Sequence, residues 1–186
     1  PVNVSPHIQI GRGHLLVIAG PCSMESETLV LETASTLAEI CHELQLPLIF
    51  KSSFDKANRT SSASFRSLGL AKGLKLLQRV KDEVGLSVIS DVHEAWQVAE
   101  VKDVLDLLQV PAFLCRQTDL LLACGASGKP TNIKKGQFLS PWDMKNVATK
   151  IAESGNEQIL LTERGASFGY NTLVSDMRSL PIMAQT

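Results

Sequence analysis

Residues 50–66 hold the clearest concentration of side chains that could bind an anion. Four basic residues stand here among serine and threonine hydroxyls, with Asp55 as the single acid: Lys51, Lys56, Arg59 and Arg66. Lysine and arginine carry positive charge, hydroxyls donate hydrogen bonds, and the planar guanidinium of arginine matches a phosphate. Long loops in compact domains are often functional, so the stretch suggests a site for one or two phosphate-bearing small molecules. The alternative is a solvated surface loop, and composition does not decide between the two.

Other polar residues that could bind a ligand or take part in catalysis recur at one kind of position in the chain. They stand just past the ends of the six predicted strands and are Cys22, Lys51, Asp91 with His93, Gln109, Lys134, and Glu163 with Arg164. In a parallel sheet these ends share one edge, where binding sites are built. Any one such residue is more often a plain loop residue, but six strands agree. The cations outnumber the acids, which suits a substrate with more than one acid group.

Six alternations of strand and helix must position these residues. The expected strands are 15–19, 48–51, 87–90, 104–108, 131–134 and 159–162, and the first is a continuous apolar run typical of a strand buried on both faces. Helices are expected from Ser26 to near Pro47, over 70–84, 95–102, near 119–124, from Ser140 with Pro141 at its first position, and over 173–183. This order predicts a parallel sheet, as an open doubly wound fold or a (β/α)8 barrel. A barrel typically needs about 250 residues, so six units would leave it unclosed.

Composition limits the partners. The chain has 186 residues, 44% hydrophobic and 20% charged, with a net charge of −1. This is globular composition without a general attraction to nucleic acid or an anionic membrane. It contains no run of about 18 apolar residues, so no membrane-spanning helix is expected. Without a signal-peptide pattern, the expected location is the cytoplasm.

The cysteines and histidines carry few local signals. No Cys-x-x-Cys pair occurs, and no disulfide is expected in a reducing compartment. Cys41 falls on the apolar face of a predicted helix and is expected in the core. His93 stands two residues from Asp91 after a strand, which favours a functional role over a surface one. His7, His14 and His42 are expected at the surface, and Gly11-Arg12-Gly13 lacks the third glycine of a dinucleotide turn.

Several longer motifs stand out in the sequence. They are Ile18-Ala19-Gly20-Pro21-Cys22, the run from Phe50 to Thr60 with Lys56-Ala57-Asn58-Arg59, Ser90-Asp91-Val92-His93-Glu94, Gln109-Val110-Pro111-Ala112-Phe113, Arg116-Gln117-Thr118-Asp119, Asn132-Ile133-Lys134-Lys135, and the run from Glu163 to Tyr170. Together these motifs resemble one enzyme family, the 3-deoxy-D-manno-octulosonate 8-phosphate synthases. The resemblance extends from about Leu15 to the last residue. The related synthase that makes the seven-carbon shikimate precursor has Lys-Pro-Arg-Thr where this chain has Lys56 to Thr60.

The resemblance implies a transferase of lipopolysaccharide sugar biosynthesis. Such an enzyme condenses phosphoenolpyruvate with D-arabinose 5-phosphate and water, giving 3-deoxy-D-manno-octulosonate 8-phosphate and inorganic phosphate. C3 of the enol attacks the aldehyde, water adds at C2, and phosphate leaves by C–O cleavage. It also implies a (β/α)8 TIM barrel, of which residues 1–186 supply about six units as a single domain, and a homotetramer.

Site residues follow from the same resemblance. The positions matching the phosphoenolpyruvate site are Lys51, Ser53, Gln109, Ala112, Lys134 and Arg164, with Arg116 as a neighbouring phosphate contact. Arg59 and Thr60 match the residues that hold the pentose phosphate, and Thr60 keeps the hydroxyl of the family's usual serine. The expected catalytic residues are Asn58, Asp91 and His93, which would bind the sugar hydroxyls and orient the aldehyde, and Lys56, which would lie between the substrates.

Cys22 matches the cysteine that marks the metal-dependent class of the family. Thiolate is a good ligand for a borderline-soft divalent ion such as zinc or iron. The expected cofactor is a divalent metal: zinc, iron or manganese. A lone cysteine is usually packing, so this assignment depends on the resemblance alone. The family's other ligands are a His, a Glu and an Asp from the seventh and eighth barrel units. The chain is therefore expected to be truncated before the seventh strand, with those ligands outside it.

Two other functions stay open. The first is a sister synthase that uses erythrose 4-phosphate (3-deoxy-7-phosphoheptulonate synthase) or N-acetylmannosamine. The Ala57-Asn58 pair argues against erythrose 4-phosphate. The second is an inactive remnant that binds sugar phosphates or serves assembly only.

Overall fold

The computed structural model describes residues 1–11, 13 and 15–186, which form two compact units. The first unit is Pro1–Asp91 with Val101–Leu107, and the second is Val92–Glu100 with Leu108–Thr186. The predictions for His14 and for the Gly11-Arg12-Gly13 turn involve residues outside this description. The parallel strands follow one another in the order β3-β4-β5-β6-β7-β8, with helices between them. This succession of strands and helices confirms the predicted fold class, an α/β fold with six consecutive strand–helix repeats of a TIM barrel.

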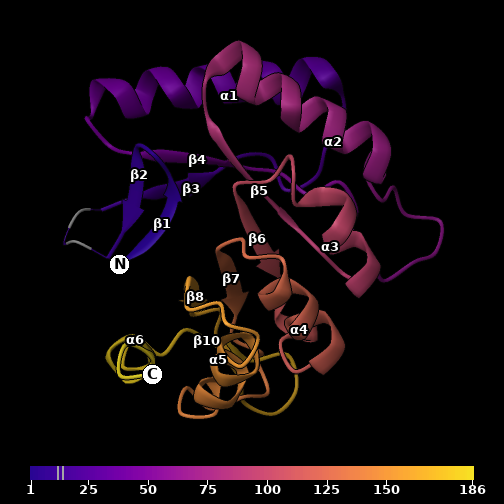
Figure 1. The fold of residues 1–186 in the computed structure, drawn as a ribbon. Coiled ribbons are helices and arrows are strands. Elements are labelled where there is room, and N and C mark those ends of the chain that lie inside the picture. The colour runs from indigo at the N-terminus through magenta and orange to yellow at the C-terminus, as the bar shows by residue number, and fades with distance from the viewer. Residues whose placement is uncertain (12, 14) are drawn as a thin grey trace. The chain divides into compact units, whose positions relative to one another are not determined.

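The first unit packs its helices over a parallel sheet of apolar strands. β3 (Val17–Ala19), β4 (Leu48–Lys51) and β5 (Ser87–Asp91) pair in parallel. In Figure 1, α1 (Glu27–Glu43) and α2 (Leu70–Arg79) lie side by side over β4. α1 begins where expected, because the Ser26 hydroxyl accepts a hydrogen bond from the Leu29 N–H at 3.2 Å. Its buried residues include Val30, Ala34 and Cys41, so the core placement of Cys41 is confirmed.

Two features of this unit were not predicted. The first residues form an antiparallel hairpin of β1 (Val2–Ser5) and β2 (Ile8–Ile10). The end of α2 continues as a π-helix, η1 (Val80–Val84), which stops at Gly85 in a left-handed conformation. Lys81 on this turn binds the Val104 carbonyl and the Asp106 carboxylate at 2.9 and 2.8 Å. Neither feature leaves a simple periodic pattern in the sequence.

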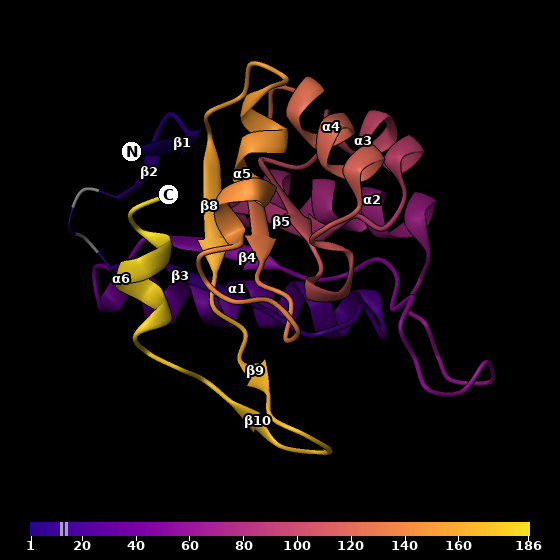
Figure 2. The same cartoon turned by 90° about the horizontal axis from the view of Figure 1, so that it is seen from below.

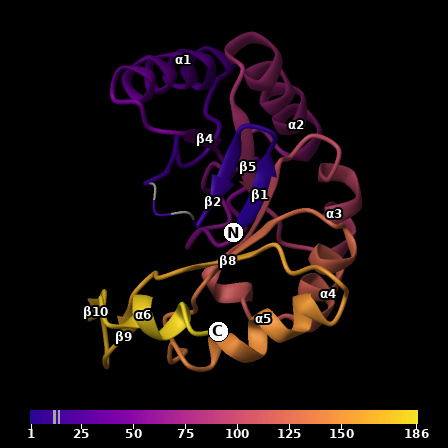
Figure 3. The ribbon, with the colours of Figure 1, turned by 60° about the vertical axis from the view of Figure 1, so that its left-hand side comes forward.

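The second unit repeats the strand–helix pattern. Its elements are α3 (Ala95–Val101), β6 (Leu107–Val110), the 3-10 turn η2 (Ala112–Leu114), α4 (Thr118–Ala126), β7 (Thr131–Lys134), α5 (Met144–Ala152) and β8 (Ile159–Thr162). The last two strands pair along their length, from Thr131↔Ile159 to Lys134↔Thr162. Figure 3 shows α4 and α5 side by side. The predicted buried face of α5 is confirmed at Met144, Val147 and Ile151.

Three predicted boundaries were wrong for local reasons. The fourth strand begins at Leu107, because the backbone N–H groups of Val104 and Leu105 bond back to the Val101 carbonyl and prolong a turn. α5 begins at Met144, because the Ser140 hydroxyl donates to the Asp143 carboxylate and residues 141–143 form tight turns. β3 is shorter than predicted and partly exposed, since it has one neighbouring strand instead of two.

The end of the chain also differs from the prediction. Instead of one helix over 173–183, β9 (Ala166–Ser167) and β10 (Leu173–Val174) form an antiparallel hairpin. A short helix, α6 (Ser179–Met183), follows. Figure 2 shows the hairpin extending beyond the end of β8. The Phe168 N–H bonds to the Thr172 carbonyl and closes the turn that the glycine-rich loop makes. No helix among the residues with described structure is long and apolar enough to cross a membrane.

Ser67 joins two loops of the first unit while holding a strained backbone. Its φ is +91°, in the region that L-residues other than glycine rarely adopt. Its hydroxyl accepts from the Met24 N–H at 2.9 Å and lies 2.9 Å from the Ser53 carbonyl and 3.1 Å from that of Met24. The loops after β3 and β4 are therefore connected through one side chain.

We expect Ser67→Ala to destabilise the protein more than Ser67→Gly. Alanine loses the hydroxyl contacts and keeps the strain, at about 1–3 kcal/mol for unmade buried hydrogen bonds. Glycine loses the same contacts but relieves a left-handed cost of about 1–2 kcal/mol. Urea unfolding of the two variants measures the difference. Equal losses, or a larger loss for Ser67→Gly, would contradict the strain argument.

Candidate active site

In the first unit, three neighbouring strands deliver polar residues to one edge. Lys51 is the last residue of β4, and Asp91 is the last of β5. Ser53 follows β4 and forms an isolated parallel bridge with Ser23, which brings Cys22 to the same edge. Gly20 permits this approach, since a Cβ there would overlap the Lys51 carbonyl. The expected clustering at the strand ends is present within this unit.

The carboxylate of Asp91 is the centre of this cluster. Its Oδ2 accepts from Lys51 Nζ at 3.2 Å and from the Ser53 hydroxyl, and lies 4.0 Å from Lys56 Nζ. Ser53 Oγ also accepts from Lys51 Nζ at 2.7 Å and Lys56 Nζ at 2.9 Å. All four side chains are at least half-buried. Two ammonium groups against one carboxylate leave a positive charge in a partly water-excluded place, where it attracts an anion strongly.

Cys22 stands next to this charge. The residue is exposed, and a hydrogen bond with Lys56 lowers the pKa of its thiol. Partial burial opposes the shift, and the charges of Lys56 and Lys51 add to it. A lower pKa means that the thiolate, the form that binds metals and electrophiles, is present at lower pH.

The loop after β4 places its two arginines differently. Asn58, Arg59 and Thr60 are all exposed. Arg59 donates from Nε to the Phe65 carbonyl at 3.2 Å and lines a shallow pocket with Glu25, Ser64 and Phe65. Arg66 is engaged by Asp55 through bonds of 2.9 and 2.5 Å, which raise the pKa of its guanidinium. Of the two, Arg59 is therefore the better placed to receive a phosphate.

In the second unit, a chain of side-chain hydrogen bonds fixes Gln109. The Thr162 hydroxyl donates to Asn132 Oδ1 at 2.7 Å, and Asn132 Nδ2 donates to Gln109 Oε1 at 3.1 Å. Gln109 and Asn132 are buried on the adjacent strands β6 and β7. The bond from Asn132, accepted by the Gln109 oxygen, fixes the orientation of the Gln109 side-chain amide. Gln109 lies within the strand rather than past its end, contrary to the prediction.

The other predicted residues of this unit lie at the strand ends or near them. Lys134 is the half-buried last residue of β7, and Arg164 is exposed two residues after β8. Ala112 is buried at the start of η2. His93 is half-buried, and its backbone N–H donates to Gln97 Oε1 at 2.8 Å. His93 belongs to the second unit and Asp91 to the first.

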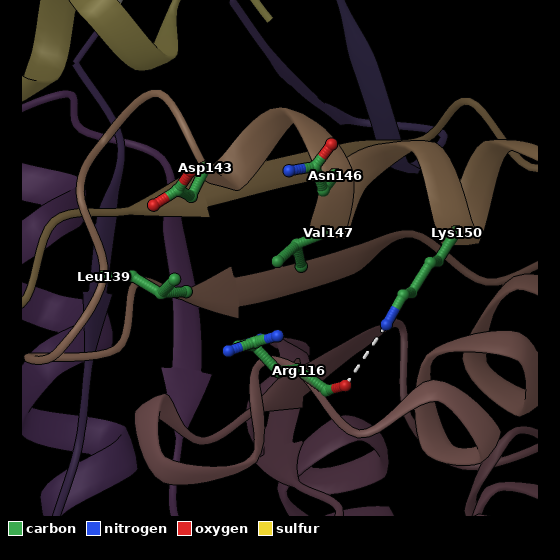
Figure 4. A pocket seen from close by; sticks show the side chains of 6 residues that line it. All are labelled: Arg116, Leu139, Asp143, Asn146, Val147 and Lys150. Carbon is green, nitrogen blue, oxygen red and sulfur yellow. Dashed lines mark hydrogen bonds between the residues drawn. The ribbon is translucent and has the colours of Figure 1, made fainter.

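Arg116 faces a pocket of its own. The cavity, of about 320 Å³, is lined by Arg116, Leu139, Asp143, Asn146, Val147 and Lys150. Figure 4 shows the guanidinium pointing toward Leu139, while Lys150 Nζ donates to the Arg116 carbonyl at 3.3 Å. None of the other predicted substrate-binding residues lines this pocket.

Comparison with known proteins decides the family. A model of the DAHP synthetase I family matches residues 1–186. This chain belongs to the DAHP synthetase I family. Together with this match, the names of the relatives described next confirm the resemblance predicted from the motifs.

Several proteins similar to this chain are named 2-dehydro-3-deoxyphosphooctonate aldolase. The Pelobacter propionicus protein is 62% identical over 177 residues, 95% of this chain and 65% of that protein. The Rhodopseudomonas palustris protein is 58% identical over 187 residues, 100% of this chain and 65% of that protein. The Cyanothece protein is 57% identical over 183 residues, 98% of this chain and 67% of that protein. The chain thus spans about 65% of the length of the first two relatives.

The divalent metal expected in this family has one matching donor in the first unit. The Cys22 thiol is accessible and its pKa is lowered, which suits a metal ligand. Among the residues that the structure describes, no group of three or more His, Cys, Asp or Glu side chains could hold a metal ion. Cys22 therefore fits the role of one ligand and does not by itself make a site.

Sequence reasoning missed residues that support the site from behind. Asn132 and Thr162 orient Gln109, Ser67 holds the Ser53 carbonyl, and Lys135 is buried beside Glu163. One signal in the sequence could have indicated the Gln109 network: the polar pair Thr131-Asn132, which lies inside the buried strand β7. Polar side chains are seldom buried without partners, so such a pair indicates a hydrogen-bond network.

The thiol pKa values predict selective alkylation. At neutral pH, iodoacetamide should label Cys22 first. Burial raises the pKa of Cys124 to about 12 and also raises that of Cys115, so these thiols should react only on unfolding. Lys56→Met removes the hydrogen bond that lowers the Cys22 pKa, so its labelling profile should move to higher pH. Lys72→Met, at an exposed position of α2, should leave the profile unchanged. Mass spectrometry of labelled peptides over pH 5–9 checks this, and identical profiles for both variants would contradict it.

Proposed function

We propose that the protein condenses phosphoenolpyruvate with D-arabinose 5-phosphate and water to give 3-deoxy-D-manno-octulosonate 8-phosphate and inorganic phosphate. The observation that carries the proposal is the cluster of Lys51, Ser53, Lys56 and Asp91 at one strand edge, in a chain whose relatives are named 2-dehydro-3-deoxyphosphooctonate aldolase. Two lysines held by one carboxylate suit a substrate with neighbouring carboxylate and phosphate groups.

In this proposal the phosphoenolpyruvate side uses the residues that match the family's phosphoenolpyruvate site. Its binding residues are Lys51, Ser53, Gln109, Ala112, Lys134 and Arg164, with Arg116 as a neighbouring phosphate contact. Gln109, whose side-chain amide is oriented by Asn132, contributes a neutral polar group to this side. Lys51 supplies positive charge, and Asp91 fixes the position of that charge. A fixed charge costs no reorganisation when negative charge develops during reaction.

The pentose phosphate side uses the exposed loop. Arg59 and Thr60 bind the sugar phosphate, the guanidinium through two parallel hydrogen bonds. Asn58, Asp91 and His93 bind the hydroxyls and orient the aldehyde toward C3 of the enol. Lys56, already bonded to Ser53 and Cys22, lies between the two substrates and stabilises the alkoxide that forms when C3 attacks.

A divalent ion completes the proposal, with Cys22 as one of its ligands. When bound, such an ion polarises an oxygen of the substrate or of water as a Lewis acid. The resemblance extends the proposal to a homotetramer, and the cytoplasm is its proposed location.

Phosphate release from phosphoenolpyruvate tests the function. We expect release with arabinose 5-phosphate, none with erythrose 4-phosphate, loss of release with a chelator and recovery with zinc, iron or manganese. Release with erythrose 4-phosphate alone would favour the sister synthase. Binding of phosphoenolpyruvate without release with either sugar would favour an inactive remnant.

Two arginine variants separate the two substrates. Arg59→Met should raise KM for arabinose 5-phosphate about 10- to 100-fold, because a charge-assisted hydrogen-bond pair contributes about 1.5–3 kcal/mol. Arg164→Met should raise KM for phosphoenolpyruvate to a similar degree. Each variant is the control for the other, and steady-state kinetics with one substrate saturating measures both. An equal effect of either variant on both KM values would contradict the assignment.

A further inference from the structure

Lys135 is a charged side chain buried in the second unit, next to a residue of the proposed site. Its side chain is 1% exposed, and it directly follows Lys134. Its Nζ donates to the carbonyls of Gly165 at 3.0 Å, Leu139 at 3.3 Å and Gly136 at 3.4 Å. A buried ammonium is costly unless its protons are taken up, and here three carbonyls accept them.

These carbonyls belong to two different loops. Gly136 and Leu139 follow β7, and Gly165 follows β8. The backbone strengthens the connection, because the Lys135 N–H donates to the Thr162 carbonyl at 2.8 Å and the Ser167 N–H to that of Gln137 at 2.9 Å. Lys135 therefore ties the loop that follows Lys134 to the loop that contains Arg164.

Glu163 completes the connection from the opposite side. Its Oε2 lies 3.7 Å from Lys135 Nζ, and its Oε1 accepts from the Gly165 N–H at 2.5 Å. The Glu163 side chain is 8% exposed. Both polar groups of Gly165 are thus held by the pair, one by the acid and one by the lysine. Gly165 has a φ of +87°, and a Cβ there would lie 2.8 Å from Leu173 Cδ1, so the turn after Arg164 accepts little variation.

The sequence alternates buried and open charges at this place. Lys135 and Glu163 point inward, while their neighbours Lys134 and Arg164 are half-buried and exposed. A buried ion pair gives little net stability compared with apolar residues of the same volume. A gain in stability therefore does not explain why this pair is buried. Its position does, because the pair connects the two loops next to Lys134 and Arg164.

We propose that Lys135 and Glu163 are positioning residues that set Arg164 at a fixed place relative to Lys134, for a ligand that carries a carboxylate and a phosphate. The identification of this ligand as phosphoenolpyruvate rests on the proposed function. Displacement of a binding group by about 1 Å can cost about 100-fold in rate, so the pair affects the reaction without touching substrate.

The proposal is tested by steady-state kinetics of two variants of the whole protein, Lys135→Met and Glu163→Gln. Lys135→Met keeps the volume and removes the donors, so KM for phosphoenolpyruvate should rise about 10- to 100-fold. Glu163→Gln keeps an acceptor for the Gly165 N–H, and a smaller rise is expected. KM for arabinose 5-phosphate should change less than about twofold in both variants. Lys81→Met, which removes a half-buried lysine bonded to Asp106 in the first unit, is the matched control and should change neither KM.

The outcomes separate this inference from the proposed function. An unchanged KM for phosphoenolpyruvate, or an equal rise of both KM values, overturns the positioning role while phosphate release by the wild type upholds the proposed function. If Lys135→Met does not fold, Glu163→Gln alone decides by the same criteria. A wild-type protein that releases no phosphate overturns the proposed function and this inference with it.

Discussion

The carboxylate of Asp91 is the interaction on which the cluster in the first unit depends. Lys51 and Lys56 both donate to the Ser53 oxygen, so their two ammonium groups lie close together and repel each other. A neighbouring anion offsets this repulsion. Asp91 supplies that anion from the end of the next strand. Parallel pairing is what allows this, because it brings the carboxyl ends of β4 and β5 to the same edge. The sheet therefore determines where the charge lies, and the charge determines what can bind.

The second unit places its groups by a different means. Gln109 is oriented by neutral donors and acceptors that extend across three strands, whereas Arg164 stands beside a glycine held by a buried ion pair. A neutral network fixes direction at little desolvation cost, while a buried pair fixes position at a larger one. Under the proposed function, Gln109 and Arg164 bind the substrate, and both sets of supporting residues hold these two side chains in place.

The sequence predicted the strands and the polar residues at their ends well, because apolar runs and their punctuation are local signals. All six parallel strands exist, and Lys51, Asp91 and Lys134 close three of them. The prediction of helix starts was wrong where a side chain has an unexpected partner. The Ser140 hydroxyl, for example, donates to the Asp143 carboxylate instead of capping a helix. The supporting contacts of Asn132, Lys135 and Ser67 could not be predicted either, because they join residues that only strand register and loop geometry bring together.

Gly20 shows that the close approach of the loops after β3 and β4 depends on the backbone itself. Any side chain at this position would overlap the Lys51 carbonyl, so the segment that leads from β3 to Cys22 could no longer lie against the end of β4. No shift of rotamer can relieve the overlap, since the obstructing atom is backbone. In evolutionary terms, Gly20 leaves no conservative step, because even alanine would place a Cβ against the Lys51 carbonyl. An exposed helix position such as Glu32 on α1 meets no such limit. Over evolutionary time, change is thus expected at positions of that kind and not at this glycine.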